Sequence, residues 1–244
     1  MTLNTQGLVL HTVNYSETSL VARIFTRQLG ERSYLVRGAR SAKSRAKRNL
    51  LQPMSLLEMT VYENHRDQLQ YIKEMQPAQP LNGCTGHPVK TAILFFMNEV
   101  VYKAVREEEA NPPLFDFLVS QMQALDETVA PLGDYPVRFL LRLSQYLGIA
   151  PLDNYAAATP LFHMQEGRFV GQPSRYAHPQ DLGCCLDLEE SRLLHAYLAA
   201  GGQAVPPPPV SRRAMTGMLL RYYALHLPGM QEIRSVEVLH QLLS

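Results

Sequence analysis

Tryptophan is absent from the 244 residues of this chain, and cysteine occurs only three times. Cys184 and Cys185 are adjacent and Cys84 stands alone, so they do not form a disulfide framework and suit a reducing compartment. Charged residues are also scarce, at 18%, and no long biased tract occurs, which argues against extensive disorder. The hydrophobic content of 46% is sufficient for one large domain or two smaller ones.

Long hydrophobic runs are missing as well. The longest, AILFFM at residues 92–97, is too short to span a bilayer, and residues 1–15 have no basic stretch followed by an apolar one. We therefore expect a soluble cytoplasmic protein with no membrane partner.

The common catalytic signatures GxxxxGK[ST], GxGxxG, GxSxG and HExxH are also absent. Glu107, Glu108 and Glu109 are consecutive at a predicted helix end and point in different directions, which is typical of a solvated face and not of a nuclease site. We expect no enzyme and no catalytic residues. A nuclease or another phosphoryl-transfer enzyme stays an alternative.

Potential metal ligands gather in one segment, which holds His163, His178, Cys184 and Cys185. Structural zinc sites use CxxC-type pairs, because that spacing lets two thiolates reach one ion, and adjacent cysteines lack it. We expect no metal site and no cofactor.

Positive charge, by contrast, is concentrated in the first third of the chain. Residues 1–80 hold eleven Lys and Arg against six Asp and Glu, although the net charge of the whole chain is +1. This local excess favours a polyanionic partner. Within residues 23–48 the acid Glu31 stands among nine basic residues: Arg23, Arg27, Arg32, Arg37, Arg40, Lys43, Arg45, Lys47 and Arg48.

Hydrophobic periodicity divides the chain near residue 80. Residues 6–76 read as five short strands and predict a small closed barrel or sandwich, with the basic stretch on a loop or a short exposed helix. From residue 87 onward helical stripes dominate, with Asn111, Asp134 and Asp187 placed to begin helices. The fold class is therefore α+β, with domains at 1–80 and 81–244 and an irregular insert at 151–186.

Basic side chains beside a small barrel indicate nucleic-acid binding through phosphates. Aromatic residues on neighbouring predicted strands, if they face outward, add surfaces for base stacking. The candidates are Tyr15, Phe25, Tyr34, Tyr62 and Tyr71, of which we select Tyr15 and Tyr34. The alternative is a solvated basic loop with the aromatic residues in the core.

A second basic surface lies in the helical part. Arg138 and Arg142 are four residues apart and share a helix face beside apolar side chains, which suits an acidic peptide with an apolar end. Arg212 and Arg213 are further candidates for this surface. The alternative is an ordinary core helix with its arginines toward solvent.

Four segments together resemble the RecO family of bacterial DNA repair and recombination mediators. They are GLVLHTVNYSETSLVARIFTRQLGERSYLVRGAR, LLQPMSLLEMTVYE, FLLRLSQYLGIAPLDNY and YYALHLPGMQEIRSVEVLHQLL, in this order, and they extend over most of the chain. The resemblance implies an N-terminal OB-fold and a helical second domain. It also implies binding of single- and double-stranded DNA, strand annealing, and contacts with RecR and the acidic tail of single-strand-binding protein. Through these contacts such a protein helps to load RecA, without consuming a nucleotide itself.

The chain departs from the family at one place. Many RecO-like sequences carry a four-cysteine zinc motif after the segment that here reads LGIAPLDNY, whereas this chain has Tyr155 and Ala158 about where the first pair would stand. We expect the insert to persist without zinc, held by apolar packing of residues such as Leu161, Phe162 and Phe169. A protein-interaction scaffold, in which the barrel binds a protein and the basic loop is incidental, remains the rival interpretation.

Overall fold

The computed structural model describes residues 2–39, 45–62, 69–105, 109–171, 184–201 and 209–243, with the backbone alone at 209–211. Arg40 and Lys43, two of the predicted DNA-binding residues, lie outside the described residues.

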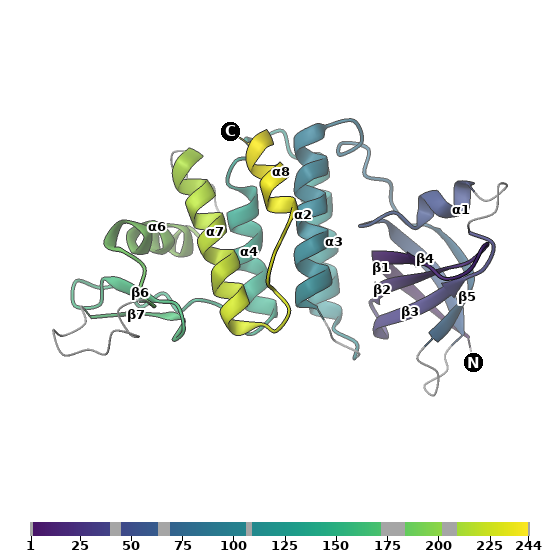
Figure 1. Ribbon diagram of the computed structural model, residues 1–244, viewed down its shortest axis with the longest axis horizontal. Coiled ribbons are helices and arrows are strands. Elements are labelled where there is room, and N and C mark those ends of the chain that lie inside the picture. The colour runs from purple at the N-terminus through teal and green to yellow at the C-terminus, as the bar shows by residue number, and fades with distance from the viewer. Residues whose placement is uncertain are drawn as a thin grey trace. The chain divides into compact units, whose positions relative to one another are not determined.

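Five strands form a closed barrel in the first part of the chain, as the pattern of residues 6–76 predicts (Figure 1). The order around the barrel is β1-β2-β3-β5-β4, in which β3 and β5 pair parallel and the other neighbours pair antiparallel. The fold is therefore OB-like, as expected. The strands are β1 (Thr2–Asn14), β2 (Leu20–Thr26), β3 (Gly30–Val36), β4 (Leu56–Tyr62) and β5 (Leu69–Pro77).

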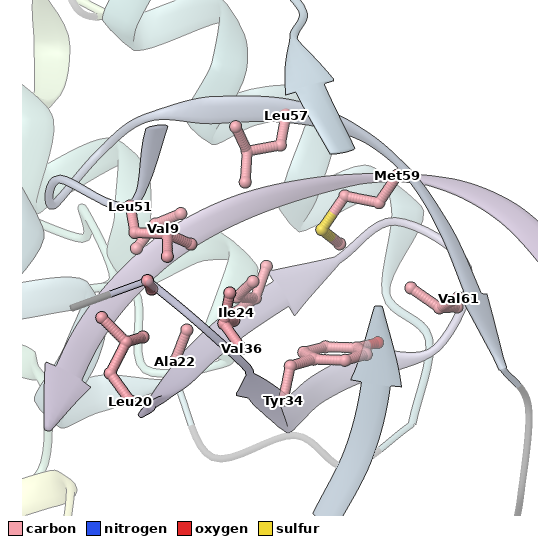
Figure 2. Packing of buried hydrophobic residues seen from close by; sticks show 11 residues of the cluster. Val9, Leu20, Ala22, Ile24, Tyr34, Val36, Leu51, Leu57, Met59 and Val61 are labelled. Atoms are coloured by element: carbon pink, nitrogen blue, oxygen red, sulfur yellow. The ribbon is translucent and has the colours of Figure 1, made fainter. Parts of the chain in front are cut away.

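Side chains from every second strand position meet inside the barrel (Figure 2). Ile24, Tyr34 and Val61 come from three different strands and have no exposed surface. Gly7 lies on β1 where Met59 and Ile24 come close, and a Cβ at this position would overlap both side chains. The close approach explains a glycine in the interior of a strand, where it is otherwise unfavourable.

Two helices, α2 (Pro88–Ala104) and α3 (Pro112–Glu127), follow the barrel and pack with it. The rings of Phe25 on β2 and Phe115 on α3 lie 5.9 Å apart and are both fully buried. The Asn98 side-chain amide on α2 donates a hydrogen bond of 3.1 Å to the Leu10 carbonyl on β1. Asn111 caps α3 as predicted, since its Oδ1 accepts from the Leu114 amide at 3.1 Å.

By its internal contacts the chain forms two compact units, Met1–Val129 and Ala130–Ser244. The predicted division near residue 80 coincides with the change from strands to helices, which lies between Pro77 and Pro88. That residue 80 separates two independent domains stays a prediction, because α2 and α3 belong to the same compact unit as the barrel. Throughout the described residues, every helix is too short or too polar to serve as a membrane span.

The second unit is mainly helical, with α4 and α7 packed against each other. The Tyr223 hydroxyl on α7 donates a hydrogen bond of 2.7 Å to the Leu140 carbonyl on α4, and both residues are fully buried. Asp187 caps α6 as predicted, accepting from the Glu190 amide at 2.8 Å. The elements are α4 (Tyr135–Tyr146), β6 (Leu161–His163), β7 (Arg168–Val170), α6 (Leu188–Ala199), α7 (Pro209–His226) and α8 (Ser235–Leu242).

The insert at 151–186 contains the β6–β7 hairpin in its described parts, 151–171 and 184–186. The Asn154 side chain acts as a further strand partner, because its amide group donates to the Phe169 carbonyl at 2.9 Å and accepts from the Phe169 amide at 2.8 Å. The Leu186 amide donates to the Phe162 carbonyl at 2.9 Å on the other edge. Side-chain and backbone bonds thus satisfy the hairpin on both sides.

Aromatic packing fills the interior of the insert. Phe162 and Phe169 are buried with ring centroids 5.1 Å apart, which confirms the packing predicted for these two residues, while Leu161 is partly buried. Tyr155 meets the edge of Phe169 at 5.3 Å and stacks on His195 at 4.4 Å. Within the described residues, no group of three or more His, Cys, Asp or Glu side chains is placed to hold a metal ion.

Candidate nucleic-acid interface

A groove of about 1010 Å³ opens on the barrel between β5 and α1 (Arg45–Leu50), the short exposed helix that carries part of the basic stretch. Both elements are labelled in Figure 1. The lining of the groove combines apolar, aromatic and cationic side chains. The lining residues are Leu35, Val36, Arg37, Ala46, Lys47, Leu50, Tyr62, Tyr71, Ile72, Lys73, Glu74, Met75 and Pro77.

Strand pairing explains why the groove exists. β3 pairs with β5 only from Ser33↔Leu69 to Leu35↔Tyr71, while β5 continues along β4 as far as Pro77. Beyond Val36 the chain turns away through Gly38, whose φ of +70° is the left-handed conformation that glycine adopts easily. The two strands therefore diverge, and α1 lies across the space that opens beside β5.

Cations surround this groove. The Arg37 guanidinium lies 5.3 Å from the centroid of the Tyr71 ring, and the Lys47 ammonium donates a hydrogen bond of 2.9 Å to the Arg37 carbonyl. Arg45 and Arg48 are exposed on α1, and Lys73 is exposed on β5. Among the described lining residues, Glu74 is the single acid beside the three cations Arg37, Lys47 and Lys73, and this balance favours a positive potential.

Three predicted DNA-binding arginines lie outside this groove. Arg27 forms a two-pronged ion pair with Asp116 of α3, at 2.8 and 2.9 Å, and the hydrogen bond from Arg27 lowers the pKa of the Asp116 carboxyl. Arg23 pairs with Glu31, and its guanidinium lies 4.7 Å from the Tyr102 ring centroid. Arg32 donates to the Glu31 carbonyl at 3.0 Å. Carboxylates of the protein itself thus already neutralise Arg23 and Arg27.

The structure separates the two tyrosines selected from the sequence for base stacking. Tyr15 is 63% exposed in the turn between β1 and β2, but it does not line the groove. Tyr34 is fully buried in the barrel core (Figure 2), so its ring cannot stack on a base and that prediction is wrong. Tyr62 and Tyr71 face outward instead, with 47% and 40% of their surface exposed.

Burial of Tyr34 has a measurable consequence at high pH. Burial raises the pKa of Tyr34 from 10.0 to about 12, so the folded barrel resists ionisation that the unfolded chain allows. The free energy of unfolding is therefore expected to hold its value below about pH 10 and to fall as the pH rises toward about 12. Tyr34→Phe should show a smaller fall in urea titrations at about pH 9 and pH 11. An equal fall in both proteins would show that Tyr34 is not the cause.

The second predicted basic surface lies on α4 and α7 of the second unit. Arg138 forms an ion pair with the buried carboxylate of Asp134 at 3.2 Å and lies 5.6 Å from the Tyr135 ring centroid. Asp134 makes no capping hydrogen bond, although the sequence places it at the start of a helix. Arg212 packs on Gly133, where a Cβ would overlap its guanidinium. Sequence reasoning missed Asp134 as the partner of Arg138, although the spacing of four residues is a signal for it.

Arg142 and Arg213 are exposed on α4 and α7. Burial raises the pKa of the Tyr197 phenol to about 12. The Asp134 carboxylate also raises this pKa, whereas the charges of Arg212 and Arg138 lower it. The structure therefore brings Arg138 and Arg212 near the same buried phenol. Arg213 lies toward α8, where burial and then the positive charge of Arg213 lower the pKa of His240.

Two models of one protein family match this chain, one over the barrel and one over the helical part that follows it. The family model described as "Recombination protein O N terminal" matches residues 1–81, and "Recombination protein O C terminal" matches residues 86–234. The chain belongs to the RecO family.

Similar curated proteins of this family carry the name "DNA repair protein RecO". The relative in Phocaeicola vulgatus is 33% identical over 100% of both chains, and that in Bacteroides fragilis is 32% identical over 99% of both. Membership of the RecO family supports a role in DNA repair and recombination.

Proposed function

We propose that this protein is a DNA-binding recombination mediator, and not an enzyme, that holds single- and double-stranded DNA through phosphates. The observation that carries the proposal is the groove between α1 and β5, where Arg37, Lys47 and Lys73 outnumber Glu74 among the described lining residues. Arg45 and Arg48 extend the same positive surface along the exposed face of α1.

Contacts of this kind give affinity without sequence preference. Lys and Arg side chains that neutralise phosphates release condensed counterions, and this release drives binding without reading the bases. A surface that lowers the repulsion between two phosphate backbones also allows complementary strands to approach each other, while their base edges stay free to pair. Strand annealing follows from the same cations.

The partners of the proposed mediator come from its family. We place the acidic tail of single-strand-binding protein on the second unit, where the exposed Arg142 and Arg213 supply cations beside apolar helix faces. Arg138 and Arg212 lie on the same two helices, although Arg138 is already paired with Asp134. RecR is the second partner, and RecA is helped indirectly. The protein would act without a metal or nucleotide cofactor, in the cytoplasm at the nucleoid.

The test is fluorescence anisotropy of a labelled single strand over a series of salt concentrations. A variant with Arg37, Arg45, Lys47 and Arg48 all changed to Ala removes four cations from this surface. If the four side chains contact four phosphates, the slope of log K against log salt should be about −3 for the unchanged protein. The variant should bind weakly, with a slope shallower by about 2 to 3.

A matched control removes four exposed arginines from the second unit: Arg168, Arg192, Arg221 and Arg234. Net charge changes by the same amount in both variants, so a loss restricted to the first one locates DNA at the groove. Equal binding by the unchanged protein and both variants would reject this surface. If none of the three proteins binds DNA, the scaffold interpretation is favoured, in which the apolar part of the groove receives a protein.

Incubation of labelled DNA with the protein and Mg²⁺ or Mn²⁺ separates the mediator from a phosphoryl-transfer enzyme. The mediator leaves the DNA intact after long incubation. Shortened products that require the divalent ion would support a nuclease instead.

A further inference from the structure

Tyr62 and Tyr71 form a pair of neighbouring aromatic side chains on the surface of the barrel. They are register partners in the antiparallel β4–β5 ladder, so their side chains leave the sheet on the same face. The preceding residues, Val61 and Gln70, are buried, as the alternation of a strand requires. Both tyrosines line the groove between α1 and β5.

Two large aromatic rings exposed side by side indicate a surface that binds a ligand. Phe25 and Tyr34 in the same barrel are fully buried, whereas Tyr62 and Tyr71 keep 47% and 40% of their surface in solvent. Apolar side chains continue the surface within the groove, namely Leu35, Leu50, Ile72 and Met75. Apolar surface gathered in one hollow on a soluble protein is typical of a binding site.

The charges beside the rings restrict the chemistry of that partner. Arg37 lies over the Tyr71 ring at 5.3 Å, Lys47 is held beside Arg37 by its hydrogen bond to the Arg37 carbonyl, and Lys73 follows two residues after Tyr71. A ligand that fits must offer flat apolar faces linked to negative charges at short intervals. An unpaired nucleotide chain has this composition, since each base is followed by a phosphate.

We propose that the groove binds unpaired bases, which stack on Tyr62 and Tyr71 while Arg37, Lys47 and Lys73 hold the adjoining phosphates. This inference rests on the proposed DNA binding and adds a preference for single strands over duplexes. In a duplex the faces of each base are covered by its neighbours, so a duplex engages the cations alone. Stacking depends little on base identity because every base has a flat π-face.

The decisive variant is Tyr62→Leu combined with Tyr71→Leu, which keeps apolar side chains on the barrel but removes both rings. We expect its affinity for an oligothymidine strand to fall by roughly 5-fold or more for each stacked base. Its affinity for a duplex of equal length and its salt slope should stay the same, because no cation is lost. A strand of equal charge without bases should bind equally to the variant and to the unchanged protein.

Tyr146→Leu is the matched control, because Tyr146 is exposed to a similar extent, 38%, on α4 of the second unit. It should bind the oligothymidine strand as the unchanged protein does. If the unchanged protein binds DNA but the double variant binds the strand equally well, the stacking inference is overturned and the proposed DNA binding stands. If the unchanged protein binds no DNA, the proposed function fails and the inference fails with it.

A second variant tests stacking without weakening it. The chain has no tryptophan, so Tyr71→Trp introduces a single indole emission at the groove. The oligothymidine strand should quench this emission, whereas the strand without bases and the duplex should leave it nearly unchanged. Quenching by an acidic apolar peptide but not by the oligothymidine strand would overturn the inference and assign the groove to a protein partner.

Discussion

Phe169→Ala is expected to lower the free energy of unfolding of the second unit by about 3–5 kcal/mol. Phe169 is 1% exposed, and its ring is surrounded by Phe162 at 5.1 Å, Tyr155 at 5.3 Å and His195 at 6.3 Å between centroids. Its removal leaves a cavity among rings that come from three separate parts of the unit. Urea unfolding, with amide hydrogen exchange of β6 and β7, measures the loss.

Phe95→Ala provides the control, because it makes the same chemical change at a side chain that is 52% exposed on α2. A similar loss in both variants would contradict a special role for the packing around Phe169.

Chelation provides a second check of the same packing. We expect a strong chelator to leave the melting temperature unchanged, since aromatic side chains surround Phe169 in the described part of the insert. A chelator that lowers the melting temperature would contradict the expectation that the insert holds no zinc.

Phe115→Ala is expected to destabilise the first unit by about 3–5 kcal/mol, including the barrel that lies before it in the sequence. Phe115 is fully buried on α3 and packs against Phe25 of β2 with the rings 5.9 Å apart. Loss of this contact removes support from the barrel wall as well as from the helix. Hydrogen exchange of the β1 and β2 amides should therefore become faster together with that of α3.

The neighbouring residue offers a control for this prediction. Asp116→Ala removes the exposed ion pair with Arg27, and exposed pairs contribute little to stability. Its unfolding curve should stay close to that of the unchanged protein. If Phe115→Ala accelerates exchange in α3 but leaves β1 and β2 protected, the barrel is stable without the helix, and the predicted division near residue 80 describes an independent domain.

Local patterns in the sequence were sufficient for most of the secondary structure. Alternation over residues 6–76 predicted the strands of the barrel, and the basic stretch was expected on a loop or short exposed helix, where α1 lies. Asn111 and Asp187 cap helices as predicted because a cap requires only a side-chain oxygen and an amide two or three residues later. Asp134 differs, since its carboxylate pairs with Arg138 one turn further on.

The aromatic residues show where local reasoning stops. Tyr34 and Tyr71 are register neighbours of the same strand pair, because Tyr34 faces Gln70 and Leu35 faces Tyr71. One ring nevertheless lies in the core and the other in the groove. A shift of one residue along a strand reverses the face of every side chain, and composition alone does not specify which face is covered.

What the sequence determined by itself is the sign and the position of the charge, the barrel strands followed by helices, and membership of the RecO family, whereas the β6–β7 hairpin in the insert predicted to be irregular was missed. Only the tertiary structure decided which cations remain available. Glu31 and Asp116 neutralise Arg23 and Arg27, whereas Arg37 and Lys47 lie beside Lys73 and two exposed tyrosines. The reason is physical: pairing and burial depend on distances between residues that are far apart in the chain, and these distances exist only once the barrel has closed.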